Sequence, residues 1–326
     1  MKVSRVLTLL AIEVKHLSKR FGDFQAVTDI NLSVQDGETF GFLGPNGAGK
    51  TTTIRILTGI SAPTEGTASI FGLDIVKETI AAKGLMGVVP ETSNVYDDLS
   101  AWRNLMFSAE LYGIGKSVRE RKGQELLEMF GLWSRRGDKA RGYSKGMKRR
   151  LTLAMGLINE PRLLFLDEPT SGLDVQSNLI IRDVIRDLNA RKVTVFLTTH
   201  NIEEANLVCD HVAIVNRGRI AAVDSPERLK GTIQSVQSVE VAFDRPSAEL
   251  METLKGMGRA SEVRKEGDKF RIFTEDPAAV MAELMEYSKM QANRIISMNT
   301  FGPSLEDVFI KLTGLEINAK GVRTVD

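Results

Sequence analysis

Three glycines, a lysine and a threonine lie between Gly44 and Thr51 at a spacing that can hold a polyphosphate. The segment reads Gly44-Pro45-Asn46-Gly47-Ala48-Gly49-Lys50-Thr51, which has the form G-x-x-x-x-G-K-[ST]. Glycines let the backbone pass close to an anion and aim its N–H groups at it. Lys50 supplies a positive charge for the β and γ phosphates, and Thr51 a hydroxyl ligand for Mg²⁺. The pattern predicts a nucleotide-binding loop. The residues expected to contact nucleotide are Gly44, Pro45, Asn46, Gly47, Ala48, Gly49, Lys50, Thr51 and Thr52.

A strand and a helix must flank such a loop for it to bind phosphate. The apolar segment Thr39 to Leu43 is typical of a buried strand, and Thr51 to Leu57 is typical of a helix. The N-terminal end of that helix adds a partial positive charge beneath the phosphates. A glycine-rich surface turn is the alternative, and the flanking strand and helix argue against it.

Two further apolar runs end in groups that could act on a phosphoryl bond. Leu163 to Asp167 ends in a carboxylate that can bind Mg²⁺, and Glu168 follows as the candidate for polarising the attacking water. Val193 to Thr198 leads to His200, which can donate a hydrogen bond to the γ-phosphate. Central parallel strands carry functional groups at their C-terminal edge, so we expect these side chains to lie together. The alternatives are a helix cap for the two acids and a purely structural histidine.

The composition bounds what else the chain can be. It has 326 residues, 42% of them hydrophobic and 26% charged, with a net charge of +1, which fits two globular domains. The near-zero net charge gives no electrostatic case for binding nucleic acid or an anionic membrane. A single cysteine, Cys209, excludes an intrachain disulfide and fits a reducing compartment. The apolar run Val6 to Ile12 contains Thr8, ends at Glu13 and lacks a cleavage site, so a signal peptide is not expected.

The spacing of apolar residues divides the chain into segments of different type. Short strands are predicted from residue 11 to about 40, and a mainly helical insert from Leu99 to about Leu132. Lys148 to Arg150 opens a helix that runs to about Asn159, and we expect these three cations to form a solvated helix face. No apolar run is long enough to cross a bilayer, so any membrane association is expected to come through a partner.

The C-terminal part has a different organisation. The composition loosens from Leu229 to Ser238, and the elements that follow are predicted in the order βαββαβ. This order predicts a small α+β domain of ferredoxin-like type over residues 235–326. It ends with a short helix from Ser304 to Leu312, and it shows no acid–base or metal-binding cluster.

Three further segments carry a resemblance to a known family. Tyr143 to Met147 resembles the signature motif of the ABC ATPases, Ser171 to Asp174 their D-loop, and Thr199-His200 their switch histidine. The resemblance implies an α/β fold of the P-loop NTPase type, in an ATPase domain of residues 1–230. This domain is expected to have a parallel-sheet core, an antiparallel β subdomain and a helical subdomain at about residues 92–160. It also implies a head-to-tail homodimer that encloses two ATP molecules. Ser144, Gly146 and Asp174 of one chain would then contribute to the nucleotide site of the other.

The chain departs from the family pattern at three positions. Lys145 replaces the first of two glycines that usually follow the signature serine. Phe21 stands where the family usually has a tyrosine that stacks on adenine, and its ring can stack nearly as well. Glu91 stands where the family usually has glutamine, and its carboxylate is expected to ligate Mg²⁺ or its water.

The C-terminal segment Ser304 to Phe309 resembles the ATPase subunits of type 2 ABC exporters, such as the daunorubicin-resistance and sodium-extrusion ATPases. That branch implies a cytoplasmic ATPase held at the membrane by a permease on a separate chain, which selects the substrate. Glu91 to Tyr112 would contact the permease through Tyr96, Leu99 and Trp102, although Trp102 is also a candidate core residue. The alternative is a soluble ABC ATPase acting on the ribosome or on nucleic acid. Such proteins generally carry paired cassettes or coiled-coil insertions, whereas this chain has one cassette and no heptad run in the roughly 90 residues between loop and signature.

Overall fold

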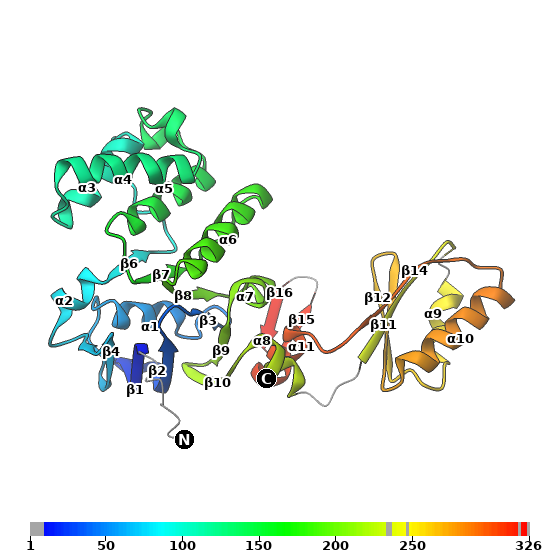
Figure 1. Ribbon diagram of the computed structural model, residues 1–326. Helices are drawn as coiled ribbons and strands as arrows, with labels where there is room; N and C mark the ends of the chain where they lie inside the picture. The colour runs from blue at the N-terminus through cyan, green and yellow to red at the C-terminus, as the bar shows by residue number, and fades with distance from the viewer. Residues whose placement is uncertain (1–9, 233–236, 246–247, 319–320, 325–326) are drawn as a thin grey trace, which may run out of the picture. The chain divides into compact units, whose positions relative to one another are not determined.

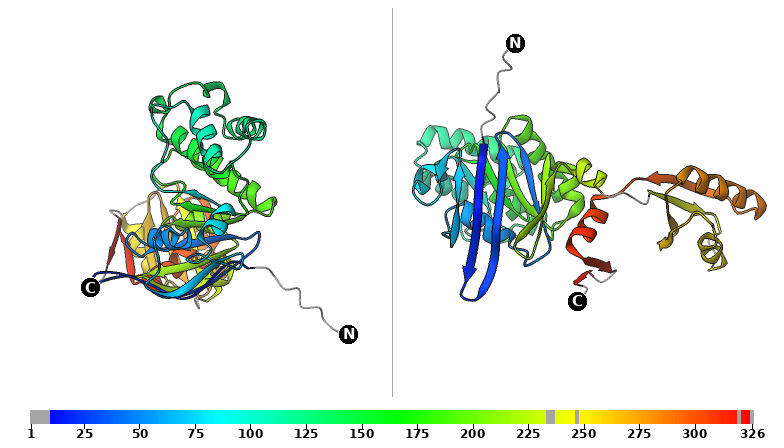
Figure 2. Two further views of the ribbon diagram at one scale, coloured as in Figure 1. Left: turned by 90° about the vertical axis from the view of Figure 1, so that its left-hand side faces the viewer. Right: turned by 90° about the horizontal axis from the view of Figure 1, so that it is seen from below.

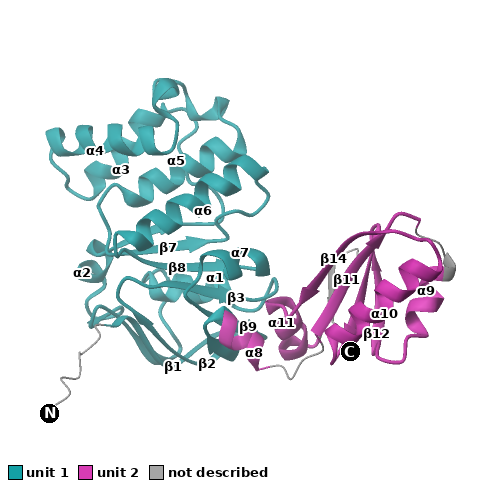
Figure 3. Cartoon of the chain, turned by 45° about the vertical axis from the view of Figure 1, so that its right-hand side comes forward, with its two compact units in different colours: residues 1–226 teal, residues 227–326 magenta. Residues whose placement is uncertain are grey.

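The computed structural model describes residues 10–232, 237–245, 248–318 and 321–324 (Figure 1). The chain forms two compact units, Met1–Pro226 and Glu227–Asp326 (Figure 3). Part of the run from Val6 to Ile12, considered above as a targeting segment, lies outside the described residues.

A six-stranded sheet forms the centre of the first unit. Its strand order is β10-β9-β3-β8-β7-β6. All neighbouring pairs from β9 to β6 are parallel, and β10 adds an antiparallel edge through a hairpin. The strands are β3 (Thr39–Leu43), β6 (Met86–Val89), β7 (Leu163–Asp167), β8 (Thr194–Thr199), β9 (His211–Asn216) and β10 (Arg219–Asp224). Residues of β3, β7 and β8 are buried throughout, which explains their continuous apolar sequences.

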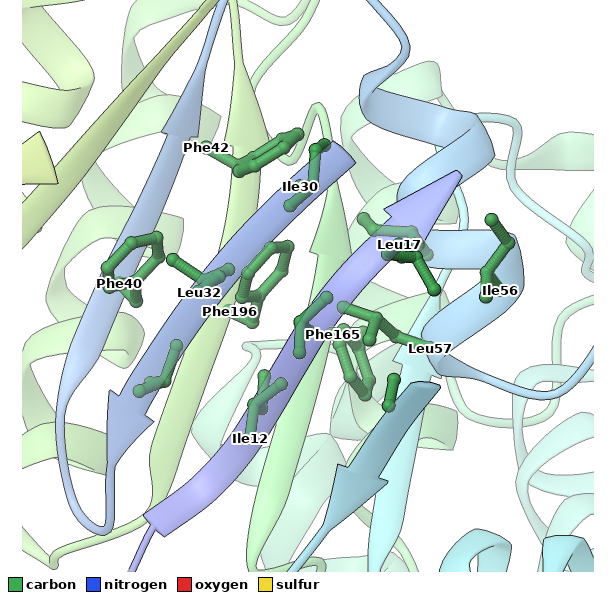
Figure 4. Close-up of a cluster of buried hydrophobic side chains, with 14 of the residues drawn as sticks. Ile12, Leu17, Ile30, Leu32, Phe40, Phe42, Ile56, Leu57, Phe165 and Phe196 are labelled. Atoms are coloured by element: carbon green, nitrogen blue, oxygen red, sulfur yellow. The ribbon is translucent and has the colours of Figure 1, made fainter. Parts of the chain in front are cut away.

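A second, antiparallel sheet packs against the first. It has the order β2-β1-β4-β5, and its long strands β1 and β2 lie side by side in Figure 2. Its strands are β1 (Leu10–Phe21), β2 (Phe24–Gln35), β4 (Glu65–Ile70) and β5 (Leu73–Asp74). Its apolar side chains face the stacked rings of Phe40 and Phe196, whose centroids lie 5.8 Å apart (Figure 4). This buried layer fixes β3, and therefore the start of the phosphate loop.

Helices surround the central sheet. They are α1 (Lys50–Leu57), α2 (Thr79–Gly84), α3 (Ala101–Leu111), α4 (Lys116–Met129), α5 (Lys145–Leu157), α6 (Val175–Ala190) and α7 (Ile202–Val208), with 3₁₀ turns at Trp133–Arg135 and Ala140–Gly142. The predicted helical insert from Leu99 to Leu132 is two helices, because Gly113 adopts a φ of 71° and ends the first. Within the described part of the chain, none of the helices combines the length and apolar character that a bilayer span requires.

Helix α5 lies directly against β6 through two glycines. A Cβ at Gly87 would collide with the carbonyl oxygen of Gly156, and a Cβ at Gly156 would lie 2.7 Å from Val89 Cγ2. Backbone contact between helix and sheet places the N-terminal half of α5 beside the ends of the central strands. Any side chain at these two positions would push the helix away.

Replacing Gly87 by alanine is therefore expected to destabilise the first unit by about 2–3 kcal/mol and to lower its Tm by roughly 4–12 °C. Differential scanning calorimetry of the full chain measures the change. Gly84→Ala is the matched control, because nothing lies within 4 Å of a Cβ at Gly84. Equal Tm values for the two variants would contradict the close helix–sheet contact.

The second unit contains a four-stranded antiparallel sheet with the order β12-β13-β11-β14. Its core is formed by side chains of this sheet and of helices α9 and α10, including Val241, Ile272 and Leu284. Helix α11 follows, capped by Ser304 and Asp307, each of which bonds the other's backbone N–H. The elements are α8 (Pro226–Gly231), β11 (Gln237–Phe243), α9 (Ala248–Lys255), β12 (Glu262–Glu266), β13 (Lys269–Thr274), α10 (Pro277–Met290), β14 (Ile295–Phe301), α11 (Leu305–Thr313), β15 (Leu315–Asn318) and β16 (Gly321–Thr324). The predicted βαββαβ order is present from β11 to β14, whereas β15 and β16 were not predicted.

Candidate functional site

A cavity of about 400 Å³ lies beside the predicted phosphate loop. Its volume falls within the range of small-molecule sites. Residues of the loop and the start of α1 form part of its lining, and four other segments complete it through Phe24 and Ala26, Glu91, Glu168 and Ser171, and His200. The strand ends and the loop therefore meet at one place, as the parallel order of β3, β7 and β8 requires.

The loop owes its shape to glycines that no other residue can replace without strain. Gly47 and Gly49 have φ values of 82° and 98°, in the left-handed region. A Cβ at Gly44 would lie 2.5 Å from Val215 O, and one at Gly49 would lie 2.6 Å from Ala26 O. The loop is thus held close to β9 and β2 by backbone contact, and its course is preformed.

Lys50 begins α1 and points back across the loop. Its Nζ donates to the carbonyl oxygens of Gly44 (2.7 Å) and Pro45 (3.2 Å), and it forms an ion pair with Glu168 Oε1 at 3.1 Å. Only 6% of Lys50 is exposed. The ammonium group is therefore satisfied by its own chain, at the place where the motif predicts phosphate oxygens.

Glu168 lies between two potential cations. One carboxylate oxygen pairs with Lys50, and Oε2 lies 2.8 Å from His200 Nδ1. Glu168 is 7% exposed and has a φ of 46°, a left-handed conformation that costs a non-glycine residue of the order of 1 kcal/mol. Its amide donates to Thr198 O, which anchors this turn to β8. The helix-cap alternative for the acidic pair is wrong, because the next helix begins at Val175 and is capped by Asp174.

Asp167 and Thr51 form an oxygen pair that fits Mg²⁺. Thr51 Oγ1 donates to Asp167 Oδ1 at 3.4 Å, and Thr198 Oγ1 donates to the same oxygen at 2.5 Å. Mg²⁺ prefers oxygen ligands and is held in phosphate-transfer sites by one or two protein groups together with phosphates and water. Among the described residues no cluster of three or more His, Cys, Asp or Glu side chains could hold a metal by itself. The donor set matches a cation that is shared with phosphates.

The aromatic residues near the cavity differ from the prediction in one respect. Phe24 contributes to the lining, whereas Phe21, its partner across the β1–β2 turn, is not part of it. Both rings are exposed, by 52% for Phe21 and 65% for Phe24, and Lys19 Nζ lies 5.0 Å from the Phe21 ring centroid. Sequence reasoning did not identify Phe24, because its place as the first residue of β2 is set by the short turn before it.

The expectation that Lys148 to Arg150 form a solvated helix face is wrong for Arg149. Lys148 does reach the surface and pairs with Asp97 at 2.6 Å. Arg149, by contrast, is 3% exposed. Its guanidinium donates to four carbonyl oxygens, those of Pro90, Glu91, Asp167 and Pro169. Burial lowers the pKa of Arg149 to about 10, so the side chain remains charged at neutral pH.

Helical spacing contained a signal for this burial. Gly146, Arg149, Leu153 and Gly156 are buried and recur every three or four residues along α5. They therefore share the face that packs on the sheet. Three consecutive cations suggested an exposed segment. The helical spacing of the buried residues instead places Arg149 on the buried face of α5.

The signature-like residues lie away from the chain's own phosphate loop. Ser144, Gly146 and Asp174 are not among the residues lining the cavity beside Lys50. Ser144 caps α5 by accepting from Met147 N at 3.2 Å, and Asp174 caps α6 by accepting from Ser177 N at 2.8 Å. This backbone hydrogen bond lowers the pKa of Asp174. A Cβ at Gly146 would collide with Ser177 Oγ of α6 and would lie 3.4 Å from Asp174 Oδ2, so the signature glycine packs against the start of α6 and the last residue of the segment that resembles a D-loop.

Lys145, the departure from the usual signature, also turns toward that segment. Its Nζ occupies the space that a Cβ at Gly172 would take. Gly172 has a φ of 65°, so glycine is required there for the backbone as well. The Lys145 ammonium group therefore lies against Gly172 of its own chain and does not simply face solvent.

Comparison with known families and relatives agrees with this arrangement. A family model described as ABC transporter matches residues 27–171. Nod factor export ATP-binding protein I of Cupriavidus metallidurans is 36% identical over 94% of this chain and 98% of its own length. Linearmycin resistance ATP-binding protein LnrL of Bacillus subtilis is 31% identical over 93% of this chain and 98% of its own length.

Solved structures show the same fold over about two thirds of the chain. A structure described as the ATP-binding subunit of an ABC transporter is 29% identical, with a TM-score of 0.64, and covers 68% of this chain and 92% of its own. A dimeric bacterial ABC transporter cassette is 25% identical, with a TM-score of 0.61, and covers 66% of this chain and 98% of its own. Both similarities run over nearly the whole length of the solved chains.

Proposed function

Because the chain belongs to the ABC transporter family as an ATP-binding subunit, we propose that it hydrolyses ATP in the cavity beside Gly44 to Thr51 and thereby energises export. The observation that carries this proposal is the cluster of Lys50, Glu168 and His200 within hydrogen-bonding distance beside the loop. Phosphoryl transfer is catalysed mainly by positioning and by electrostatic stabilisation, and these side chains can supply both.

Each group has a distinct proposed role. Lys50 leaves Glu168 and the loop carbonyls to bind the β and γ phosphates. Glu168, released from Lys50, accepts a hydrogen bond from the attacking water and polarises it. His200 donates to the γ-phosphate, for which it must either turn away from Glu168 or carry both ring protons. The loop amides from Gly44 to Thr52 surround the remaining phosphate oxygens.

Thr51 and Asp167 are the proposed protein ligands of Mg²⁺, with Glu91 as a further oxygen donor from the opposite wall. When bound, the cation neutralises charge on the phosphate oxygens. Glu91 is exposed at the cavity, which leaves its carboxylate free to turn toward a bound nucleotide.

The adenine is proposed to stack on Phe21, by analogy with the aromatic residue of the family. Phe21→Ala is expected to weaken ATP binding about tenfold, since base–aromatic stacking contributes roughly 1–3 kcal/mol. Titration with a fluorescent ATP analogue measures the change. Phe24→Ala is the matched comparison, because Phe24 is the neighbouring exposed ring and itself lines the cavity. A larger loss from Phe24→Ala would transfer the stacking role to Phe24.

The complete site is proposed to need a second copy of the chain. Ser144 and Gly146 lie at the N-terminal end of α5, where a serine hydroxyl and free amides can meet a γ-phosphate. They do not line the cavity of their own chain. Two copies arranged head to tail would therefore enclose two ATP molecules, with Asp174 at the interface.

The transport partner is proposed to be a membrane permease on a separate chain, which holds this subunit at the cytoplasmic face. The segment from Glu91 to Tyr112 is the proposed contact. Tyr96 is 52% exposed, and its ring packs edge-on against Phe107. Leu99 is half-buried, and Trp102 packs against Trp133, which supports the core interpretation of Trp102.

The second unit is proposed to be an accessory domain of ferredoxin-like type over residues 235–326, with residues 1–230 as the ATPase domain. The antiparallel order β12-β13-β11-β14 supports the ferredoxin-like interpretation. The compact units divide slightly earlier, after Pro226. A stabilising role in the dimer is the proposed function of this domain.

Two measurements test the proposal. Purified full-length protein should turn over ATP in the presence of Mg²⁺, and affinity purification from native membranes should recover an integral membrane protein. Recovery of ribosomes or nucleic acid in place of a membrane protein would favour the alternative of a soluble ABC ATPase. The names of the relatives, which concern export and resistance, do not favour that alternative.

A further inference from the structure

One buried guanidinium joins three segments that lie far apart in the sequence. Arg149 Nη2 donates to Asp167 O at 2.7 Å, and Nε donates to Pro169 O at 3.0 Å. These carbonyl groups belong to Asp167 and Pro169, the residues on either side of Glu168. Nη1 donates to the carbonyls of Pro90 and Glu91, and Glu91 is one of the residues that line the cavity.

A buried charge loses its hydration, and nearby carboxylates offset part of that cost for Arg149. Its hydrogen bonds, however, go to backbone carbonyls. A planar guanidinium presents donors in a fixed fork, so it can hold several carbonyls at set positions relative to one another. A lysine has a single charged atom, which cannot span the same acceptors.

Arg149 bonds the chain on either side of Glu168, where the backbone is in an unfavourable conformation. Glu168 has a left-handed φ of 46°, which is unfavourable for a residue with a side chain. Its amide is fixed by Thr198 O at 3.1 Å. The two flanking carbonyls are fixed by Arg149. Together these bonds set the direction in which the Glu168 carboxylate leaves the backbone.

We propose that Arg149 is a positioning residue for hydrolysis, which fixes the carbonyl groups of the residues on either side of Glu168 and ties them to the segment at Pro90–Glu91. Arg149 is not part of the lining of the cavity beside the loop, and it acts through backbone carbonyl groups. The inference rests on the proposed function, because it requires Glu168 to be the carboxylate that polarises water. It predicts a loss of turnover without an equal loss of nucleotide affinity.

The first test compares Arg149→Ala and Arg149→Lys with wild type in the full-length protein. We expect kcat for ATP hydrolysis to fall at least tenfold in both variants, and the Kd for a fluorescent ATP analogue to change by less than threefold. A purely structural role would instead weaken binding and turnover together. Lys148→Ala is the control, because this neighbouring cation forms only a surface ion pair with Asp97.

The second test is chemical rescue. A cavity of about 460 Å³ opens onto Arg149 between Tyr143, Lys148 and Ser171, so a small cation can reach the space that Arg149→Ala leaves. Millimolar ethylguanidinium should restore kcat of Arg149→Ala in a saturable manner, whereas ethylammonium at the same concentration should not. Equal rescue by both cations would show that charge alone matters and would overturn the positioning role.

The outcomes separate this inference from the proposed function. Suppose that wild type hydrolyses ATP and Glu168→Gln does not. An unchanged kcat in both Arg149 variants would then overturn the positioning role of Arg149 and leave the proposed function intact. If Arg149→Ala fails to fold, Arg149→Lys provides the same comparison of kcat with Kd. A Kd that rises in parallel with the loss of kcat also overturns the proposal. Failure of wild type to hydrolyse ATP would instead contradict the proposed function.

Discussion

Replacement of Glu168 by glutamine is expected to lower kcat for ATP hydrolysis by about 100- to 10,000-fold while ATP still binds. Glutamine has nearly the same shape, but its neutral amide is a much weaker base than the carboxylate. The carboxylate is the group that Lys50 and His200 hold at 3.1 and 2.8 Å in the present structure. A coupled assay of phosphate release at saturating ATP measures the loss.

The same variant should accumulate as an ATP-bound dimer, since the step that ends the bound state is blocked. Light scattering after size-exclusion chromatography with ATP and Mg²⁺ checks the mass. Glu160→Gln is the matched control, because its carboxylate is exposed and pairs with Lys122 at 2.6 Å. Turnover of Glu168→Gln at the wild-type rate would show that another group polarises the water.

Replacement of Lys50 by alanine is expected to weaken ATP binding by about 100-fold or more, because truncating one partner of a buried charge pair typically costs 2–5 kcal/mol. Lys50 is the cation nearest to the loop and is almost fully enclosed. The nucleotide phosphates would then face Glu168 without a compensating charge. Isothermal titration with a slowly hydrolysed ATP analogue measures the change in Kd.

Lys77→Ala controls for the loss of one positive charge, since the Lys77 side chain is 82% exposed in the turn before α2 and lies outside the cavity. Unchanged affinity in Lys50→Ala would contradict the assignment of the loop. A loss of affinity together with a large fall in Tm would indicate that Lys50 mainly stabilises the loop. Thermal unfolding without nucleotide distinguishes these results.

Residue types and spacing were sufficient to predict how Lys50, Glu168 and His200 come together. Glycine spacing identified the loop, and the two apolar runs before Asp167 and His200 indicated neighbouring parallel strands. Parallel strands bring their C-terminal ends to one edge, so proximity followed from topology. The family membership and the ATPase activity were also predicted correctly from the ordered motifs.

The role of Arg149 could not be predicted in the same way. Its acceptors are backbone carbonyls of Pro90, Glu91, Asp167 and Pro169, and carbonyl groups leave no mark in a sequence. The mainly helical insert was predicted, but the position at which α3 ends and α4 begins was not, for a related reason. Glycine at position 113 permits many conformations, and only the packed structure selects the left-handed one.

The ion pair between Lys50 and Glu168 has a consequence for how the proposed site would bind phosphate. The two charges neutralise each other inside the fold, so a triphosphate that takes up the Lys50 ammonium leaves the Glu168 carboxylate without that cation. Under the proposed roles, a single event would therefore bind the substrate and free the group that polarises the attacking water.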